Sequence, residues 1–319
     1  MTQNNIGVLL TNIGTPDQPT PAAVRRYLKQ FLLDKRVVEI PRLIWLPILY
    51  GIILPFRAKK SAKLYQKIWT ENGSPLLHHS QQLCNAIAKK LNIPVVLGMH
   101  YGNPSIETAL NELKKKNVTR ILILPLYPQY SATTTASTFD CVSAVLKKWR
   151  VIPEIHMISD YADDPLYINA LAKSIRSAQT QHIAQKIIFS FHGIPKKFID
   201  SGDPYKNRCE TTVKLLTDKL NLTQNDYELT FQSRLGRAEW LQPYTDKTLS
   251  ELPTRNITDI QVICPGFAVD CLETLEEIAI QGKKQFLESG GKHFEYIPAL
   301  NHSDAHLEMF AEIIKKYMS

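Results

Sequence analysis

The segment 185-QKIIFSFH-192 is an apolar run that ends in a histidine and is followed by Gly193. Its large apolar residues follow one another without polar alternation, which is typical of a strand buried on both faces of a parallel sheet. Seven further segments are predicted strands: 6-IGVLLTN-12, 94-PVVLGMHY-101, 120-RILILPLY-127, 154-EIHMIS-159, 227-YELTFQS-233, 259-DIQVICPGF-267 and 293-HFEYIPAL-300. The eight predicted strands form two sets of four, and the second set begins near residue 185.

Helical periodicity occupies the segments between these strands. The predicted helices are 80–91, 104–116, 135–149, 209–220, 272–287 and 303–318. Ser80 and Ser105 are predicted helix starts, and Pro104 and Pro165 suit a first helical turn. Strands that alternate with helices indicate the α/β class with parallel sheets. We therefore predict two similar Rossmann-like doubly wound domains, each with a four-stranded parallel sheet.

The start of the second strand set gives the predicted domain boundary. We expect an N-terminal domain over 1–160 and a C-terminal domain over 161–302, with the last helix, 303–319, joining the N-terminal domain. In open α/β sheets, ligands bind beyond the carboxyl ends of the strands, where the strand order reverses. His192 and the segment 264-CPGFAVDCLETLEE-277 both follow such ends.

The composition is that of an ordinary globular protein, with 319 residues, of which 44% are hydrophobic and 21% charged. The formal net charge of +8 is modest and suits an acidic small molecule or an anionic membrane surface. The sequence contains no arginine-rich block, so we expect no nucleic-acid partner. It also contains no GxGxxG or Walker A pattern, which argues against a dinucleotide or nucleoside triphosphate.

The cysteines Cys84, Cys141, Cys209, Cys264 and Cys271 are odd in number and form no CxxC pair. The polar start of the chain is unlike a signal peptide. We therefore expect free thiols, most of them buried, in a reducing cytoplasm.

The longest apolar stretch is 43-LIWLPILYGIILPF-56, which Pro47, Gly51 and Pro55 interrupt. A membrane-spanning helix needs about 20 apolar residues, so this stretch is too short to cross a bilayer. Three interpretations of this stretch remain open: an apolar lip, a peripheral contact with the inner membrane surface, and ordinary protein core. The sequence carries no signal for an oligomeric state.

His192 and the acids after residue 270 are the candidates for chemistry. Imidazole can accept a proton or ligate a metal near neutral pH, although many histidines are structural. Glu273 and Glu277 are four residues apart, which places both carboxylates on one helix face. Asp270 is a predicted N-cap. Acids in a first helical turn also stabilise the helix dipole, so both interpretations stay open here.

Two further segments suit a flat ligand. The segment 124-LPLYPQYSATTTAS-137 combines tyrosines and hydroxyls after a strand, and Trp240 lies in 232-QSRLGRAEWLQPYTD-246 after another. Together with 8-VLLTNIGTPD-17, 73-GSPL-76, 190-SFHGIP-195, 203-DPY-205 and 264-CPGFAVDCLETLEE-277, these segments resemble the ferrochelatase family, in its compact Gram-negative bacterial form. The resemblance runs in order over essentially the whole chain.

The resemblance implies that Fe²⁺ is inserted into protoporphyrin IX with release of two protons, giving protohaem, the terminal step of haem biosynthesis. It implies a lyase with the active site in the cleft between its two domains. His192 matches the proton-accepting histidine of the metal site, Glu273 the essential acid opposite it, and Glu277 the next member of an acidic row. Other matches are the pocket aromatics Tyr127, Trp240 and Phe267, and the propionate contacts Ser74, Lys60 and Lys63.

The chain departs from the family pattern at two places. Cys271 stands where many members have a histidine, which leaves its role open. Animal members hold a [2Fe–2S] cluster through cysteines in a C-terminal extension and one after PQYS, where this chain has Ala132. We expect no cluster and no permanently bound cofactor, with Fe²⁺ as substrate. The alternatives are a coproporphyrin ferrochelatase, a related Co or Ni tetrapyrrole chelatase, and a non-catalytic solute-binding protein.

Overall fold

The computed structural model describes residues 5–234, 236 and 238–318. The chain forms two compact units. The first unit comprises Met1–Leu126, Ser131–Ser159 and Phe310–Ser319, and the second comprises Tyr127–Tyr130 and Asp160–Met309. The predicted domain bounds, 1–160 and 161–302, stay a prediction.

The first unit is built on a parallel sheet of four strands in the order β2-β1-β3-β4. Its strands are β1 Ile6–Thr15, β2 Val95–Gly102, β3 Arg120–Pro125 and β4 Glu154–Met157. Val8, Leu9 and Leu10 are fully buried in the central strand β1, which agrees with its unbroken apolar pattern. On one face, Leu9 and Ile123 pack against Leu110 and Val142.

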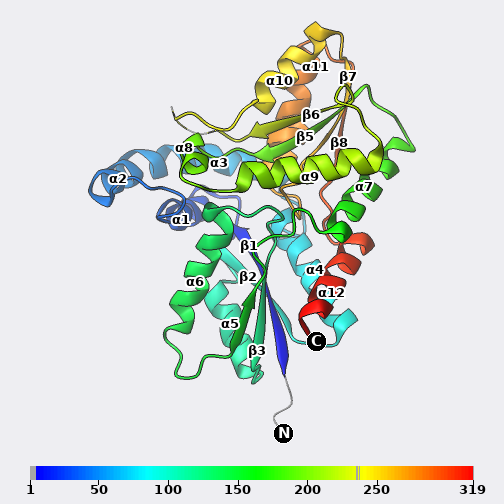
Figure 1. Cartoon of the computed structure of the whole chain (residues 1–319). Helices are drawn as coiled ribbons and strands as arrows, with labels where there is room; N and C mark the ends of the chain where they lie inside the picture. Colours follow the sequence, from blue (N-terminus) through cyan, green and yellow to red (C-terminus); the bar gives the residue numbers. More distant parts are fainter. Residues whose placement is uncertain (1–4, 235, 237, 319) are drawn as a thin grey trace. The chain divides into compact units, whose positions relative to one another are not determined.

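Helices cover both faces of this sheet (Figure 1). The helices of the first unit are α1 Pro21–Leu32, α2 Arg42–Ile48, the π-helix η1 Leu49–Ile53, α3 Leu54–Ile68, α4 Pro75–Leu91, α5 Ile106–Lys115, the π-helix η2 Ala132–Ala136 and α6 Ser137–Leu146. The last helix, α12 Asp304–Met318, belongs to the first unit from Phe310 on. Ser105 caps α5 by accepting a hydrogen bond from the Thr108 amide at 3.1 Å, as predicted.

The second unit repeats the same topology, with strands in the order β6-β5-β7-β8. They are β5 Lys186–His192, β6 Tyr227–Gln232, β7 Asp259–Ile263 and β8 His293–Ile297, and every pairing is parallel. The central strand β5 is the run on which the fold prediction rested. Its Ile188, Phe189 and Phe191 are fully buried.

Two layers of helices enclose the second sheet. The helix α9 Tyr205–Leu220 lies across one face together with α7 Pro165–Gln179 (Figure 1). The other helices are α8 Lys196–Asp200, α10 Thr245–Glu251, the 3₁₀-helix η3 Leu252–Arg255, the π-helix η4 Glu273–Gly282 and α11 Lys283–Glu288. Phe286 of α11 and Ile278 of η4 pack with Ile188 and Val262 into one core.

The predicted fold class is confirmed, and each of the eight predicted strands is present. Two local predictions were wrong. Ser80 lies inside α4, fully buried, where its hydroxyl accepts a hydrogen bond from Asn12 Nδ2 at 3.2 Å. Pro104 precedes the capping residue Ser105 instead of entering the helix. Pro165 occupies the first turn of the helix α7, as predicted.

The apolar stretch 43–56 forms α2, η1 and the start of α3. Only part of it is core: Trp45 is buried and donates from its ring nitrogen to the Leu32 carbonyl at 2.7 Å. Leu43 and Phe56, by contrast, are 92% and 74% exposed. Across residues 5–234, 236 and 238–318, no helix is long and apolar enough to span a bilayer.

The five cysteines are all free thiols, as predicted. Four of them are buried, and Cys141 is partly exposed. Burial raises the pKa of Cys84 to about 12 and that of Cys141 to about 11, so both remain protonated at neutral pH. These thiols therefore act as small apolar residues.

Candidate active site

His192 is the last residue of β5, where the central strand of the second sheet reaches its carboxyl end. Its ring Nδ1 lies 2.6 Å from the Gly193 carbonyl oxygen. Because a carbonyl can only accept, this contact puts the imidazole proton on Nδ1. The lone pair of the neutral ring is then on Nε2, the atom able to take a proton or ligate a metal.

The loops beside His192 bring two aromatic residues close to it. The ring of Phe267 lies 6.4 Å from the ring of His192, centroid to centroid. Trp240 pairs with Pro195 through a backbone bridge. A Cβ atom on Gly193 would come within 2.9 Å of the Gln232 carbonyl oxygen and 3.4 Å of the Trp240 ring. Gly193 thus permits the close approach of these three segments.

The acids Glu273 and Glu277 lie on the ten-residue π-helix η4. Hydrogen bonds in a π-helix run from residue i to i+5, so residues four apart stay close to one face. Such helices are rare and often occur at functional sites. Between these acids, Glu276 is buried and accepts a hydrogen bond from Gln281, so it serves a different contact.

Glu277 is held by the chain that follows β6. One carboxylate oxygen accepts a hydrogen bond from the Ser233 amide at 2.8 Å, and the other accepts one from the Ser233 hydroxyl. Ser233 adopts a left-handed backbone conformation, with φ 66°. This conformation is unfavourable for a residue with a side chain and persists where surrounding contacts hold it. Here it directs two donors at one carboxylate.

The environment of Glu277 raises the pKa of its carboxyl group. Burial is the largest cause of its raised pKa, and the negative charge of Glu273 acts in the same direction. Hydrogen bonds from Ser233 and the charge of His192 oppose this rise. The protonation of Glu277 is therefore linked to both His192 and Glu273.

Gln232 ties the π-helix to the sheet. Its amide nitrogen donates to the Glu273 carbonyl at 2.8 Å and lies 3.5 Å from a Glu277 carboxylate oxygen. Its amide oxygen accepts a hydrogen bond from the Ser190 hydroxyl at 2.7 Å. Since Ser190 is in β5 two residues before His192, one side chain fixes the acid-bearing helix to the strand that carries the histidine.

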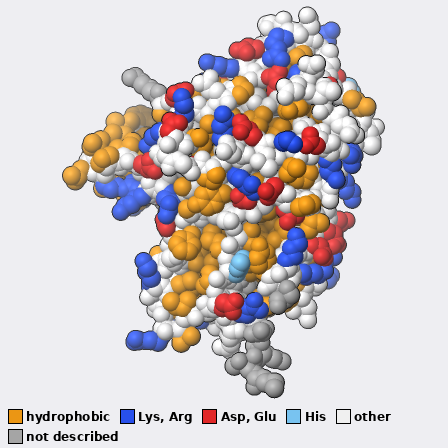
Figure 2. All heavy atoms as spheres, viewed as in Figure 1, with side chains coloured by type: hydrophobic (Ala, Val, Ile, Leu, Met, Phe, Trp, Pro, Cys, Tyr) orange, Lys and Arg blue, Asp and Glu red, His pale blue; other side chains and the backbone are white. Residues whose placement is uncertain are grey.

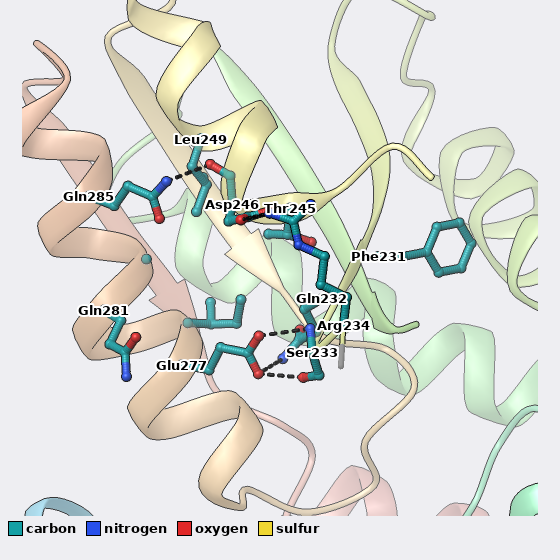
Figure 3. Close-up of a pocket in the computed structure, with 12 residues that line it drawn as sticks. Phe231, Gln232, Ser233, Arg234, Thr245, Asp246, Leu249, Glu277, Gln281 and Gln285 are labelled. Carbon is teal, nitrogen blue, oxygen red and sulfur yellow. Dashed lines mark hydrogen bonds and ion pairs between the residues drawn. The ribbon is translucent and has the colours of Figure 1, made fainter. Parts of the chain in front are cut away.

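A pocket of about 290 Å³, lined by polar and apolar side chains, opens beside Glu277 (Figure 3). Its lining includes Arg234, Asp246, Gln281 and Gln285. Arg234 and Asp246 form an ion pair at 2.5 Å at the exposed side. The close-up shows Glu277 on the pocket wall, facing Gln232 and Ser233. The partly exposed Glu277 therefore borders this pocket.

Cys271 and Asp270 lie just before the π-helix η4, and both have structural roles. Burial, followed by the charge of Glu273, raises the pKa of Cys271 well above its ordinary value, so its sulfur is a protonated thiol and a poor metal ligand. Asp270 accepts hydrogen bonds from Tyr296 at 2.6 Å and Asn301 at 2.7 Å. The predicted N-cap role of Asp270 was wrong, because its carboxylate binds side chains instead of the helix amides.

Tyr127 belongs to the short segment Tyr127–Tyr130, which is part of the second unit. Within this segment, the Gln129 amide nitrogen donates to the Thr212 hydroxyl at 2.9 Å. The amide oxygen of Gln129 lies near Gly266, where a Cβ atom would be 3.6 Å from it. The segment is thereby anchored beside the loop that carries Phe267.

The remaining predicted site residues lie in the first unit. Lys60 and Lys63 are exposed on α3, three residues apart on the same helix. Ser74 is buried, and its hydroxyl donates to the Thr15 hydroxyl at 2.9 Å. The second unit therefore groups His192, Phe267, Trp240, Glu273 and Glu277 around the ends of β5, β6 and β7, while Ser74 and the lysines form part of another unit.

Sequence reasoning missed Gln232 and Ser233 as site residues. Both begin the segment 232–246: Gln232 is the last residue of β6 and pairs in register with His192, and Ser233 follows it directly. That position at a strand end was the available signal. Their roles depend on Glu273 and Glu277, more than 40 residues later in the chain.

The chain is similar to known proteins over nearly its full length. The family model described as Ferrochelatase matches residues 5–318. A ferrochelatase of Escherichia coli O8 is 51% identical over 319 residues, which cover 99% of this chain and 100% of the relative. One of Vibrio atlanticus is 52% identical over 312 residues, with 98% of each chain covered. One of Methylococcus capsulatus is 52% identical over 315 residues.

Solved structures support the fold at low sequence identity. SirB from Bacillus subtilis with Fe³⁺ matches with a TM-score of 0.60 and 11% identity, covering 98% of this chain and 95% of that one. CbiX, the terminal enzyme for sirohaem biosynthesis in denitrifying bacteria, matches with a TM-score of 0.52 and 13% identity, covering 99% and 100%. The chain belongs to the ferrochelatase family and is a metal chelatase that inserts ferrous iron into protoporphyrin in haem biosynthesis.

Proposed function

We propose that iron insertion into protoporphyrin IX, giving protohaem, takes place at the group formed by His192, Glu273 and Glu277. The observation that carries this proposal is the linked set of protonation sites in the second unit. The Nδ1 proton of His192 is engaged by the Gly193 carbonyl, and the charges of His192 and Glu273 both act on Glu277. A reaction that replaces two pyrrole protons by Fe²⁺ needs such acceptors.

His192 is the proposed first proton acceptor. In the neutral ring Nε2 carries the lone pair, so a pyrrole N–H proton moves to Nε2 and leaves an imidazolium. The carboxylates of Glu273 and Glu277 stabilise that positive charge. Glu277, with its raised pKa, then takes the proton at less cost than an ordinary carboxylate would. The pocket beside Glu277 provides the exit to solvent.

We assign metal delivery to His192 and Glu273. Imidazole nitrogen and carboxylate oxygen both bind Fe²⁺, and a site with few protein ligands can hand the ion on. Among the described residues, His192, Glu273 and Glu277 do not belong to a group of three ligand atoms within 4.8 Å of one another. That spacing suits a path for a substrate ion better than a storage site.

The porphyrin contacts are proposed on chemical grounds. Tyr127, Trp240 and Phe267 supply aromatic surface for the flat ring, while Lys60, Lys63 and Ser74 supply cations and a hydroxyl for the two propionates. Ser74 would have to turn its hydroxyl away from Thr15 to donate to a carboxylate. Binding energy from the rest of the ring offsets the cost of bending one pyrrole towards the metal.

The experiment that tests this function is anaerobic insertion of Fe²⁺ into protoporphyrin and coproporphyrin, measured side by side by absorbance. We expect faster turnover with protoporphyrin. The proposed porphyrin contacts are mostly apolar and aromatic, and they include few cationic side chains to bind the additional carboxylates of coproporphyrin. Faster turnover with coproporphyrin would make the alternative substrate correct. Insertion into neither porphyrin would contradict the proposed function, and turnover with Co²⁺ or Ni²⁺ and a more polar tetrapyrrole would favour the related chelatases.

We further propose that an apolar patch formed by Leu43, Ile44, Ile52 and Phe56 contacts a membrane surface peripherally. All four side chains are more than half exposed. In the space-filling view, hydrophobic side chains gather over α2 with Lys and Arg beside them (Figure 2). Exposed apolar groups next to cations match the boundary between acyl chains and anionic headgroups.

Vesicle binding tests the patch. We expect the protein to cosediment with vesicles of anionic lipid, and Leu43→Asp with Phe56→Asp to abolish most of this binding. Phe139→Asp is the matched control, since Phe139 is a 54% exposed aromatic residue on α6, outside the patch. Equal binding by all three proteins would contradict the proposal. A higher salt concentration should weaken the part of vesicle binding that comes from the Lys and Arg side chains beside the patch.

The remaining assignments follow from the proposed reaction. We propose a cytoplasmic protein whose iron is a substrate, with no resident cofactor and no [2Fe–2S] cluster. We propose no nucleic-acid partner.

A further inference from the structure

Three metal-ligating side chains meet at the amino ends of β7 and β8 in the second unit. Asp259 and His293 are the first residues of these strands, and His182 precedes β5. His182 Nε2 lies 2.7 Å from Asp259 Oδ2, and His293 Nδ1 lies 3.0 Å from Asp259 Oδ1. Among the residues the structure describes, this His–Asp–His cluster is the group of three such ligand atoms that lie within 4.8 Å of one another.

The sheet itself holds the cluster together. Asp259 and His293 are register partners in neighbouring parallel strands, so their side chains leave the sheet side by side, on strands about 4.8 Å apart. The loop before β5 is fixed by two glutamines. The buried Gln261 donates to the His182 carbonyl at 3.0 Å, and Gln185 accepts from the Asp259 amide at 3.0 Å. The cluster therefore rests on backbone positions that the fold determines.

The two histidines approach the carboxylate in complementary ways. Each imidazole offers one nitrogen to a different oxygen of Asp259, and the ring centroids of His182 and His293 are 4.2 Å apart. Without a metal, each contact needs a proton on the ring nitrogen, since an ionised carboxylate only accepts. A cation between the three groups replaces these protons and satisfies all three ligands at once.

The distances suit a small transition-metal ion. Imidazole nitrogen and carboxylate oxygen bind Zn²⁺ at about 2.0–2.2 Å, which places tetrahedral ligand atoms about 3.3 Å apart. The contacts of 2.7 and 3.0 Å need to open only slightly to reach that spacing. Two imidazoles and one carboxylate favour Zn²⁺, Co²⁺ or Ni²⁺ over Mg²⁺ and Ca²⁺, which prefer oxygen ligands.

Access from solution is open. The side chains of His182, Asp259 and His293 are 39%, 22% and 47% exposed. An ion can therefore enter without unfolding, and water can fill a fourth ligand position. The carboxylate is the most covered of the three, which reduces its screening by water.

We propose that His182, Asp259 and His293 form a divalent transition-metal site separate from the site of iron insertion. The His–Asp–His cluster lies at the amino ends of the strands, whereas His192 ends β5. The six residue-to-residue steps of β5 from Lys186 to His192 span about 20 Å at roughly 3.3 Å per residue. An ion in the cluster is too far from His192 to be handed over directly. It links β7, β8 and the loop before β5, and thereby stabilises the second unit.

The test is Co²⁺ titration of the full chain carrying His192→Ala and Glu273→Gln, which disables the proposed insertion site. We expect one Co²⁺ per chain, with d–d absorption bands of nitrogen and oxygen ligands and no thiolate charge-transfer band. Adding His293→Ala should remove this binding. Adding His302→Ala should not, because His302 is an exposed histidine of the same unit outside the cluster.

A second variant and a second measurement keep the outcome clear. Asp259→Asn removes the charged ligand with little change in shape, and should also abolish Co²⁺ binding. Zn²⁺ should raise the melting temperature of the protein whose His–Asp–His cluster is intact. The His293→Ala and Asp259→Asn proteins should not show this shift. The proposal is overturned if the protein carrying only His192→Ala and Glu273→Gln binds no Co²⁺. It is also overturned if adding His293→Ala or Asp259→Asn leaves Co²⁺ binding unchanged. These readouts require no porphyrin, so they do not depend on the proposed insertion mechanism.

Discussion

Replacement of His192 by alanine is expected to lower the turnover of iron insertion by about 10²–10⁴-fold, the usual contribution of a general acid–base group. Porphyrin affinity should change little, because the aromatic surface of Trp240 and Phe267 remains. The reason is the fixed tautomer: the Gly193 carbonyl holds the Nδ1 proton, so Nε2 is the atom available to a pyrrole N–H. Alanine leaves no acceptor at this position.

The measurement is steady-state turnover together with fluorescence titration of porphyrin. His302→Ala is a suitable control for loss of a histidine from the same unit. The assignment fails if the His192 variant retains near-normal turnover. A variant that instead loses porphyrin affinity while keeping turnover at saturation would make His192 a binding residue.

Glu277→Gln is expected to change activity and stability in opposite directions. Turnover should fall by about 10²-fold or more, because glutamine cannot accept a proton. Burial, followed in the same direction by the charge of Glu273, raises the pKa of Glu277 in the folded protein. A raised pKa means that stability is fully present below the unfolded pKa and is lost as pH rises through the folded pKa. Glutamine avoids that loss, so the variant should be more stable at neutral pH.

Melting curves from pH 4 to pH 8 measure the second effect. The advantage of the Glu277→Gln protein should vanish at the acidic end and grow towards neutrality, because a raised pKa in the folded state makes ionisation cost stability. Glu276→Gln removes another buried acid from the same helix, and should leave turnover largely intact. A Glu277 variant with lower stability at every pH would show that the carboxylate is held for its hydrogen bonds to Ser233.

The sequence predicted the sheets well because strand burial is a local signal. Unbroken apolar runs such as 185–192 can be satisfied only where both faces are covered. Helix starts were less predictable. Ser80 has the composition of an N-cap, but α4 begins five residues earlier at Pro75, and tertiary packing buries Ser80 against Asn12. Side chains that cap in isolation can be used elsewhere once the core forms.

The candidate site was predictable in part for the same reason. His192 ends β5 and Phe267 lies in the loop after β7, and parallel topology brings such strand ends together. The π-helix that carries Glu273 and Glu277 has no comparable local pattern, because its winding depends on contacts with distant segments. The same is true of Ser233, whose left-handed conformation becomes favourable only when Glu277 is there to receive its two hydrogen bonds.

The double hold of Ser233 on Glu277 has a consequence for how protons travel. A carboxylate fixed by a backbone amide and a hydroxyl cannot swing between donor and acceptor as an exposed glutamate does. The proton itself has to move, by transfer along hydrogen bonds, while the heavy atoms stay in place. Little nuclear rearrangement then accompanies each transfer, and the protein does not have to reorganise around a travelling charge. In the proposed mechanism, Glu277 is thus a stationary relay whose speed depends on proton hopping instead of side-chain motion.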